Sequence, residues 1–285
     1  MVKRLNAFRR RGLTTCMGLL CTFSLMAANN VVDTLTLAHV ECTNSMPVKK
    51  ANIVEFTAKA DIPVTGAIVL KQNILNWFSR LVSEATDIQQ IRMGQSVNVD
   101  SLLGYYSQNY LKQTKKEILM ILKENKDNEK HWNYTVDISL QRVYETRTYI
   151  TFCAETYTYS SGAHGLQGSS YATFRKADGK LLSWNDVLNT KNRLKFNAKV
   201  ADGIQRYFGM TNFVQLKDRL QIEGNYNRTT FPLPKGNPAF VSDGLKVHYE
   251  LYEIASYADG SPSFAIPYAE LKDFLSPMVK QLIIK

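Results

Sequence analysis

The chain has 285 residues, of which 45% are hydrophobic and 11% aromatic, and this composition excludes an intrinsically disordered protein. Its formal net charge of +10 is concentrated at the start, where five basic residues precede the first acidic residue, Asp33. Without those five of the 35 basic residues, 30 remain against 25 acidic ones, a balance of +5 that does not indicate a nucleic-acid-binding protein.

The first 28 residues have the features of a secretory signal peptide. An uncharged, mostly apolar run at positions 13–28 follows the basic residues, and the small residues Ala27 and Ala28 stand where cleavage is expected. The run is shorter than the roughly 20 residues of a membrane-spanning helix, so we expect no permanent transmembrane helix in the mature chain. Leu20 occupies the position where a lipoprotein signal has a small residue before Cys21, which disfavours lipid anchoring. The sequence therefore predicts export to the periplasm or the cell surface of a bacterium.

Two cysteines, Cys42 and Cys153, remain after the predicted signal peptide is removed. An oxidising compartment permits a disulfide between them, and the alternative is a pair of buried thiols; the sequence leaves both open. The cysteines lack the spacing of metal ligands and the four histidines are scattered, so we expect no metal site and no cofactor.

The first half of the mature chain predicts strands followed by helices. Residues 31–42 are rich in β-formers, and residues 54–62 alternate between apolar and polar side chains, as in a half-buried strand. Thr65 and Gly66 favour the start of a helix. Apolar residues then recur at helical spacing, at Leu70, Ile74, Phe78, Leu81 and Val82. A second helix is predicted at 101–124, with an apolar stripe and a lysine-rich face that we interpret as solvated.

The second half begins with the clearest period of two, at residues 132–141. Strands are also predicted at 149–159 and 170–174, on either side of a loop of small residues that displays His164. The later predicted elements are a short helix capped by Ser183, a helix with the apolar stripe Leu194, Val200, Ile204 and Phe208, a strand at 245–251, and a closing helix at 268–282.

Helices and strands are segregated along the chain, which predicts the α+β class, with antiparallel sheets and helices packed on one face. We divide the sequence into the signal peptide (1–28), an N-terminal α+β segment (29–130) and a C-terminal α+β domain (131–285). The last two can form one compact unit.

Six motifs follow one another in a specific order in the C-terminal domain: Tyr-Ser-Ser-Gly-Ala-His-Gly at 159–165, Asp-Gly-Lys at 178–180, Trp-Asn-Asp-Val-Leu at 184–188, Gly-Leu-Lys-Val-His-Tyr at 244–249, Tyr-Glu-Ile-Ala-Ser-Tyr-Ala-Asp-Gly at 252–260 and Ile-Pro-Tyr at 266–268. Together they resemble the exported domain of unknown function that forms the extracellular half of RsiV, a lysozyme-sensing anti-sigma factor. The resemblance covers roughly residues 132–285. Upstream, Asp-Ile-Pro-Val-Thr-Gly at 61–66 is similar to the segment that precedes this domain in RsiV and in the peptidoglycan deacetylase PdaC.

The resemblance implies an exported cell-envelope binding module. In RsiV the corresponding module is a lysozyme-binding surface, so the loops 160–165 and 256–260 are expected side by side, with Tyr252 and Tyr257 as aromatic anchors. The partner it implies is lysozyme, another envelope protein or a cell-wall glycan. The implied site residues are Tyr159, Ser160, Ser161, Gly162, Ala163, His164, Tyr252, Ser256, Tyr257 and Asp259.

The alternative is a cell-wall glycan-modifying or hydrolytic enzyme in which His164 acts as general base beside a carboxylate. The sequence has no Gly-x-Ser-x-Gly elbow, no cysteine nucleophile signature and no His-Glu-x-x-His zinc helix. We therefore expect no catalytic activity, and we expect His164 to hold its loop by hydrogen bonding to backbone carbonyls.

Overall fold

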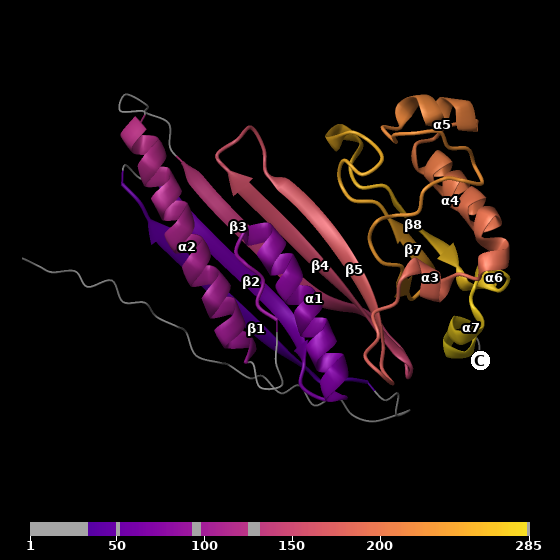
Figure 1. Ribbon diagram of the computed structural model, residues 1–285, viewed down its shortest axis with the longest axis horizontal. Coiled ribbons are helices and arrows are strands. Elements are labelled where there is room, and N and C mark those ends of the chain that lie inside the picture. The colour runs from indigo at the N-terminus through magenta and orange to yellow at the C-terminus, as the bar shows by residue number, and fades with distance from the viewer. Residues whose placement is uncertain (1–33, 50–51, 93–97, 125–131, 284–285) are drawn as a thin grey trace, which may run out of the picture.

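The computed structural model describes residues 34–49, 52–92, 98–124 and 132–283 (Figure 1). The predicted signal peptide lies outside this range. Five strands form a large mixed sheet in the order of their numbers: β1 (Leu37–Pro47), β2 (Ile53–Pro63), β3 (Asn133–Glu145), β4 (Tyr149–Ser160) and β5 (Leu166–Arg175). Two long helices, α1 (Ile68–Thr86) and α2 (Val99–Glu124), connect β2 to β3. We call these seven elements the large-sheet unit.

The strands β2 and β3 are parallel, whereas the other neighbours in the large sheet are antiparallel. A parallel pair requires a long crossover, and α1 and α2 supply it by returning the chain to the end of the sheet where β2 began. The α+β class is therefore confirmed, but the expectation of purely antiparallel sheets is wrong for this pair. The large sheet also contains strands from both sides of the domain boundary that we drew from the sequence at residue 130.

Both helices cover the same face of the large sheet (Figure 1). The predicted stripe of α1 is buried throughout, and it packs with α2 against alternating apolar residues of the strands, such as Phe56, Ile138 and Phe152. The helix begins about two residues later than expected: Ala67, not Thr65, is the N-cap, and it makes no side-chain hydrogen bond. Thr65 instead accepts a hydrogen bond from the backbone N–H of Thr36 at 2.8 Å.

The remaining chain forms a second core around a three-stranded antiparallel sheet. We call it the small-sheet unit. Its strands are β6 (Ala239–Val241), β7 (Gly244–His248) and β8 (Ser263–Pro267). Its helices are α3 (Trp184–Val187), α4 (Arg193–Tyr207), α5 (Phe213–Arg219), α6 (Tyr268–Leu271) and α7 (Pro277–Ile283), with the short 3-10 helices η1 (Thr190–Asn192) and η2 (Tyr257–Asp259).

Two helix predictions in the small-sheet unit need correction. Leu194 is exposed rather than part of the apolar stripe, and Phe196 is the residue that enters the core from the first turn of α4. The closing helix is split into α6 and α7 by Pro277. Proline lacks a backbone N–H and disfavours a helical conformation of the residue before it, so Pro277 begins a new helix instead of continuing the first.

The two units meet at the ends of β4 and β5. Tyr149, on β4, packs its ring 5.2 Å from that of Phe240, on β6, and its hydroxyl lies 3.3 Å from that of Tyr268. The hydroxyl of Thr173, on β5, accepts from the N–H of Phe240 at 3.1 Å and donates to the carbonyl of Pro238 at 3.2 Å. The junction therefore contains both apolar packing and satisfied buried polar groups.

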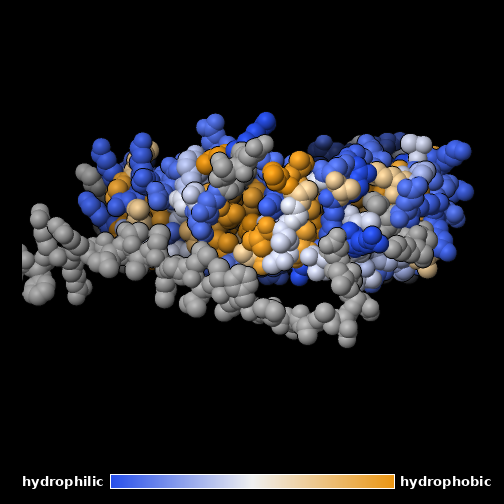
Figure 2. All heavy atoms as spheres, turned by 90° about the horizontal axis from the view of Figure 1, so that it is seen from below, coloured by the Kyte–Doolittle hydropathy of each residue, from blue (hydrophilic) through white to orange (hydrophobic). Residues whose placement is uncertain are grey.

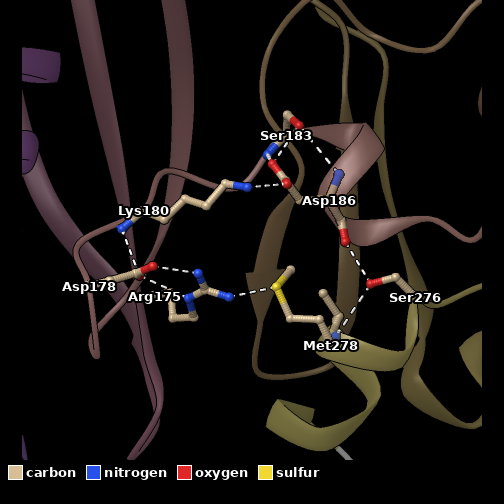
Figure 3. A network of polar contacts seen from close by, with 8 residues as sticks. Arg175, Asp178, Lys180, Ser183, Asp186, Ser276 and Met278 are labelled. Atoms are coloured by element: carbon tan, nitrogen blue, oxygen red, sulfur yellow. Dashed lines mark hydrogen bonds and ion pairs between the residues drawn. The ribbon is translucent and has the colours of Figure 1, made fainter.

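A polar network extends this junction from the end of β5 to α3 and α7 (Figure 3). Arg175 donates to the carboxylate of Asp178 at 2.9 Å and to the sulfur of Met278 at 2.6 Å. Lys180 is paired with Asp186, whose carboxylate also accepts from the N–H of the N-cap residue of α3. Burial opposes ionisation of Asp186, but its hydrogen bonds from Lys180 and the N-cap residue leave its pKa lowered.

The hydrogen bond from Arg175 lowers the pKa of Asp178 from 3.8 to about 2. Because the folded-state pKa lies below the unfolded-state value, this ion pair stabilises the fold above about pH 4, and its contribution is lost as the pH falls through about 2. We expect the free energy of unfolding of Asp178→Asn to decline less than that of the parent between these pH values. Urea unfolding at each pH checks this, with Asp137→Asn on the exposed part of β3 as the control; equal slopes for all three proteins would contradict it.

Cys42 and Cys153 are not joined by a disulfide, and both remain thiols. Cys42 lies on β1 and Cys153 on β4, with β2 and β3 between them. Three strand spacings separate the two backbones by about 14 Å, whereas a disulfide requires Cα atoms within roughly 7 Å. Of the two options that the sequence left open, the sheet therefore excludes the bridge, and the buried-thiol option fits Cys153, whose thiol pKa is raised by burial.

Apolar side chains gather near the middle of one side of the molecule (Figure 2). The largest exposed ones around the start of α1 are Val64, Ile68 and Val69. Within the described part of the chain, no helix has the length and apolar character needed to cross a membrane.

Candidate binding site

The β4–β5 hairpin ends in a short loop whose shape is fixed by local contacts. Ser161 has a positive φ of 57° and is buried, and its hydroxyl donates to the carbonyl of Asn133 at 2.8 Å. Gly165 leaves room for an aromatic ring, because a Cβ at this position would lie 2.3 Å from the ring of Tyr157. Residues 162–164 remain exposed at the tip of the hairpin.

The second predicted loop is built around η2. Ser256 caps this helix, and the carboxylate of Asp259 accepts from its N–H at 3.1 Å and from its hydroxyl at 2.6 Å. Arg219, at the end of α5, also pairs with Asp259. The hydrogen bond from Ser256 and the pairing with Arg219 lower the pKa of Asp259. The side chains of Ser256 and Asp259 are thus engaged with each other, and they shape the loop.

The two loops contact each other through aromatic rings, so they lie side by side as the resemblance implied. The imidazole of His164 stacks on the ring of Tyr257, with centroids 4.3 Å apart and an interplanar angle of 25°. The hydroxyl of Tyr257 donates to the carbonyl of Gly165 at 3.1 Å. Tyr252, with a positive φ of 64°, places its ring 5.8 Å from that of Tyr257. We call His164, Gly165, Tyr252 and Tyr257 the loop platform.

The ten predicted site residues divide by what their side chains do. His164, Tyr252 and Tyr257 form the aromatic part of the platform, in which His164 and Tyr252 are exposed and Tyr257 is half-buried, and Gly162 and Ala163 lie beside it at the hairpin tip. Tyr159 donates to the carbonyl of Gly162 at 3.2 Å. Ser161 is buried and its hydroxyl bonds to the backbone of β3, whereas the side chains of Ser256 and Asp259 shape the second loop.

A groove of about 530 Å³ opens beside the platform on the helix-covered face of the large sheet. Its floor is the part of β3, β4 and β5 that the helices leave uncovered, and its walls are the end of α1, the middle of α2 and the turn at 250–252. Tyr159, Ser160 and Tyr252 line it, so the predicted loops stand at its edge. The platform and the groove therefore form one continuous surface.

Four carboxylates line the groove, Glu84, Asp87, Glu117 and Glu250, and its lining contains no lysine, arginine or histidine. Burial and the nearby charge of Glu117 raise the pKa of Tyr134 in the floor. Burial likewise raises that of Tyr110, with Glu117 adding to the effect. The groove is therefore a region of negative potential.

His164 has the structural role that the sequence predicted. Its Nδ1 lies 3.0 Å from the carbonyl of Gly165, and Tyr257 covers one face of its ring. No hydrogen bond or ion pair joins His164 to a carboxylate in the part of the chain that the structure describes. No group of three or more metal-ligating side chains occurs in that part either.

The groove was not predicted from the sequence, although the strands carry a signal for it. On β4 the residues that face the helices are apolar at Ile150, Phe152 and Ala154, and then become Thr156, Thr158 and Ser160. On β5 the same face changes from Phe174 and Ala172 to Ser170 and Gly168. A strand face that changes from apolar to polar midway indicates where the covering helices end.

Comparison with known proteins relates this architecture to one family model. The model is described as a protein of unknown function, DUF3298, and it matches residues 186–269. That range contains β6 to β8 and the loop of η2, and it ends before α7. No curated protein matches the chain.

Two solved structures share the fold. A member of the DUF3298 family from Bacteroides fragilis has a TM-score of 0.71 and 17% sequence identity, and the match covers 88% of this chain and 100% of that one. A DUF3298 family protein from Pseudomonas aeruginosa PAO1 has a TM-score of 0.55 and 13% identity, with 85% and 95% covered. At these identities the likeness establishes the fold alone.

Proposed function

We propose that the chain is an exported, non-enzymatic module of the bacterial cell envelope that binds a protein partner of the lysozyme class through the loop platform. The observation that carries the proposal is the stacking of His164 on Tyr257, 93 positions later in the chain, which joins the two loops into one aromatic surface. The resemblance of the motifs to the extracellular half of RsiV supports lysozyme as the partner class. The signal-like first 28 residues support export.

The platform has the properties of a recognition surface. Tyrosine is among the residues that dominate binding energy at protein interfaces, because it brings a large contact area at low entropic cost. Tyr252 is 56% exposed, while hydrogen bonds and stacking hold the neighbouring rings in place. A surface that is already ordered loses little conformational entropy when it binds.

Binding of the mature chain to lysozyme, and separately to purified peptidoglycan, tests the proposal. We expect the parent to bind lysozyme and Tyr252→Ala to bind about 30-fold more weakly, since an aromatic hot spot contributes about 2 kcal/mol. Tyr105→Ala is the matched control, because Tyr105 is an exposed tyrosine of α2 outside the platform and the groove.

Three results would contradict the proposal. The parent binds no lysozyme, Tyr252→Ala binds as well as Tyr105→Ala, or the parent binds only peptidoglycan. In the last case the platform recognises a cell-wall glycan instead.

A further inference from the structure

The groove beside the loop platform carries a charge opposite to that of the whole molecule. The chain has a formal net charge of +10, yet the groove is lined by four carboxylates and by no basic side chain. Glu84 is paired with Arg80 at 2.8 Å, and Glu250 lies 3.8 Å from Nε2 of His248 besides accepting hydrogen bonds from Ser169 and Ser170. Glu117 accepts only from the neutral amide of Gln113 at 3.3 Å among the residues that the structure describes. Within that part of the chain, Glu84 is therefore the one groove carboxylate paired with a lysine or arginine.

Tyrosine rings accompany these carboxylates. Tyr110 and Tyr134 belong to the lining beside Glu117, and Tyr252 stands at the edge shared with the platform. A tyrosine ring attracts a cation to its face, and a carboxylate binds the same cation by charge-assisted hydrogen bonds. Lysine and arginine side chains are the protein groups that use both kinds of contact.

The floor of the groove suits an extended backbone. It is a stretch of open sheet across β3, β4 and β5, and it presents the hydroxyl groups of Thr156, Thr158 and Ser170. Three strands span about 10 Å, which an extended segment of roughly three residues covers at about 3.3 Å per residue. The hydroxyls of Thr156 and Thr158 can donate to or accept from the peptide groups of such a segment, and that of Ser170, which donates to Glu250, can accept from them.

We propose that the groove holds an extended, lysine- or arginine-containing segment of the protein partner that the loop platform binds. The inference rests on the proposed function, and it adds a second contact region with a defined chemistry. Charge complementarity selects a cationic protein segment over peptidoglycan, because the carboxylates of cell-wall peptides are repelled by Glu117 and Glu250.

A charge-neutralised groove tests the inference. The variant is Glu84→Gln/Asp87→Asn/Glu117→Gln; Glu250 is kept because it accepts from the N–H of Ser169 and the hydroxyl of Ser170 on β5. The control is Asp218→Asn/Glu223→Gln/Asp243→Asn, which changes the net charge equally at exposed residues outside the groove. The probes are lysozyme, a ten-residue peptide of alternating lysine and serine, its glutamate counterpart, and a neutral N-acetylglucosamine oligomer.

We expect the parent to bind lysozyme and the lysine peptide, with weaker binding as salt rises, and not to bind the glutamate peptide. The groove variant should bind both ligands at least tenfold more weakly, while the control stays within about twofold of the parent. Circular dichroism and the melting temperature establish that each variant is folded.

Two results overturn the inference and leave the proposed function standing. In the first, the groove variant binds lysozyme and the lysine peptide as tightly as the parent does, while Tyr252→Ala no longer binds lysozyme. In the second, the neutral oligomer binds the groove more tightly than the lysine peptide does. If the parent binds no lysozyme at all, the proposed function fails, and the inference fails with it.

Discussion

Phe240→Ala is expected to lower the free energy of unfolding by about 3 to 5 kcal/mol and to uncouple the two units. Phe240 is fully buried between the units, with its ring 5.2 Å from that of Tyr149 and 6.4 Å from that of Tyr268. Removing the ring leaves a cavity at the junction, and the N–H that bonds to Thr173 loses the packing that positions it. The small-sheet unit should then unfold at lower urea concentration than the large sheet.

Phe196→Ala is the matched control. Phe196 is equally buried, but it packs on Trp184 and Phe274 inside the small-sheet unit. Both variants lose a similar transfer free energy, so only the position of the cavity differs. Tryptophan fluorescence and circular dichroism should give coincident transitions for Phe196→Ala and separate ones for Phe240→Ala, because Trp77 and Trp184 report on different cores. Coincident transitions in both variants would show that the units are coupled without Phe240.

Much of the fold follows from local patterns in the sequence. The structure contains the strands predicted from the alternation at 54–62 and 132–141, and the helix predicted from the apolar stripe of α1. Each of these elements has one apolar face, and that face is buried against a neighbouring element. The pairing of β2 with β3 could not be read in this way. It depends on where two helices return the chain, and strands of either direction alternate alike when one face is solvated.

The errors in the small-sheet unit have local causes. Leu194 and Phe196 are both apolar residues in the first turn of α4, but only Phe196 lies four residues before Val200, on the face that Val200 and Ile204 share. Pro277 was a signal for the break between α6 and α7 that the apolar pattern around it obscured. Helical spacing decides the first case, and backbone chemistry decides the second.

The platform was predicted from motif order, whereas the groove was not predicted at all. His164 and Tyr257 lie 93 positions apart, so no local pattern places them in contact, and the expectation came from the resemblance of the two loops to a known module. The groove combines residues of α1, α2, three strands and a turn, none of which is unusual alone. Its negative potential arises only when the fold assembles Glu84, Asp87, Glu117 and Glu250.

Tyr257→Ala is expected to have the largest effect on partner binding, about 100-fold or more, because this residue holds the platform together as well as contributing its own surface. Its ring stacks on His164 and lies against Tyr252, and its hydroxyl bonds to the carbonyl of Gly165. Without the ring, both loops must be ordered by the partner, and the lost preorganisation adds to the roughly 2 kcal/mol of an aromatic hot spot. Titration calorimetry with lysozyme measures the change.

Tyr257→Phe separates the two contributions of this side chain. It keeps the stacking on His164 and removes only the hydrogen bond to Gly165, which is worth about 1 kcal/mol, so a reduction of about fivefold is expected. An affinity between those of the parent and Tyr257→Ala is expected if the stacked rings, rather than the hydrogen bond, provide most of the order of the platform. A Phe variant as weak as the Ala variant would show instead that the hydrogen bond between the loops is the decisive contact. Equal binding by all three proteins would exclude the platform from recognition, because Tyr257→Ala removes both the stacking on His164 and the hydrogen bond to Gly165.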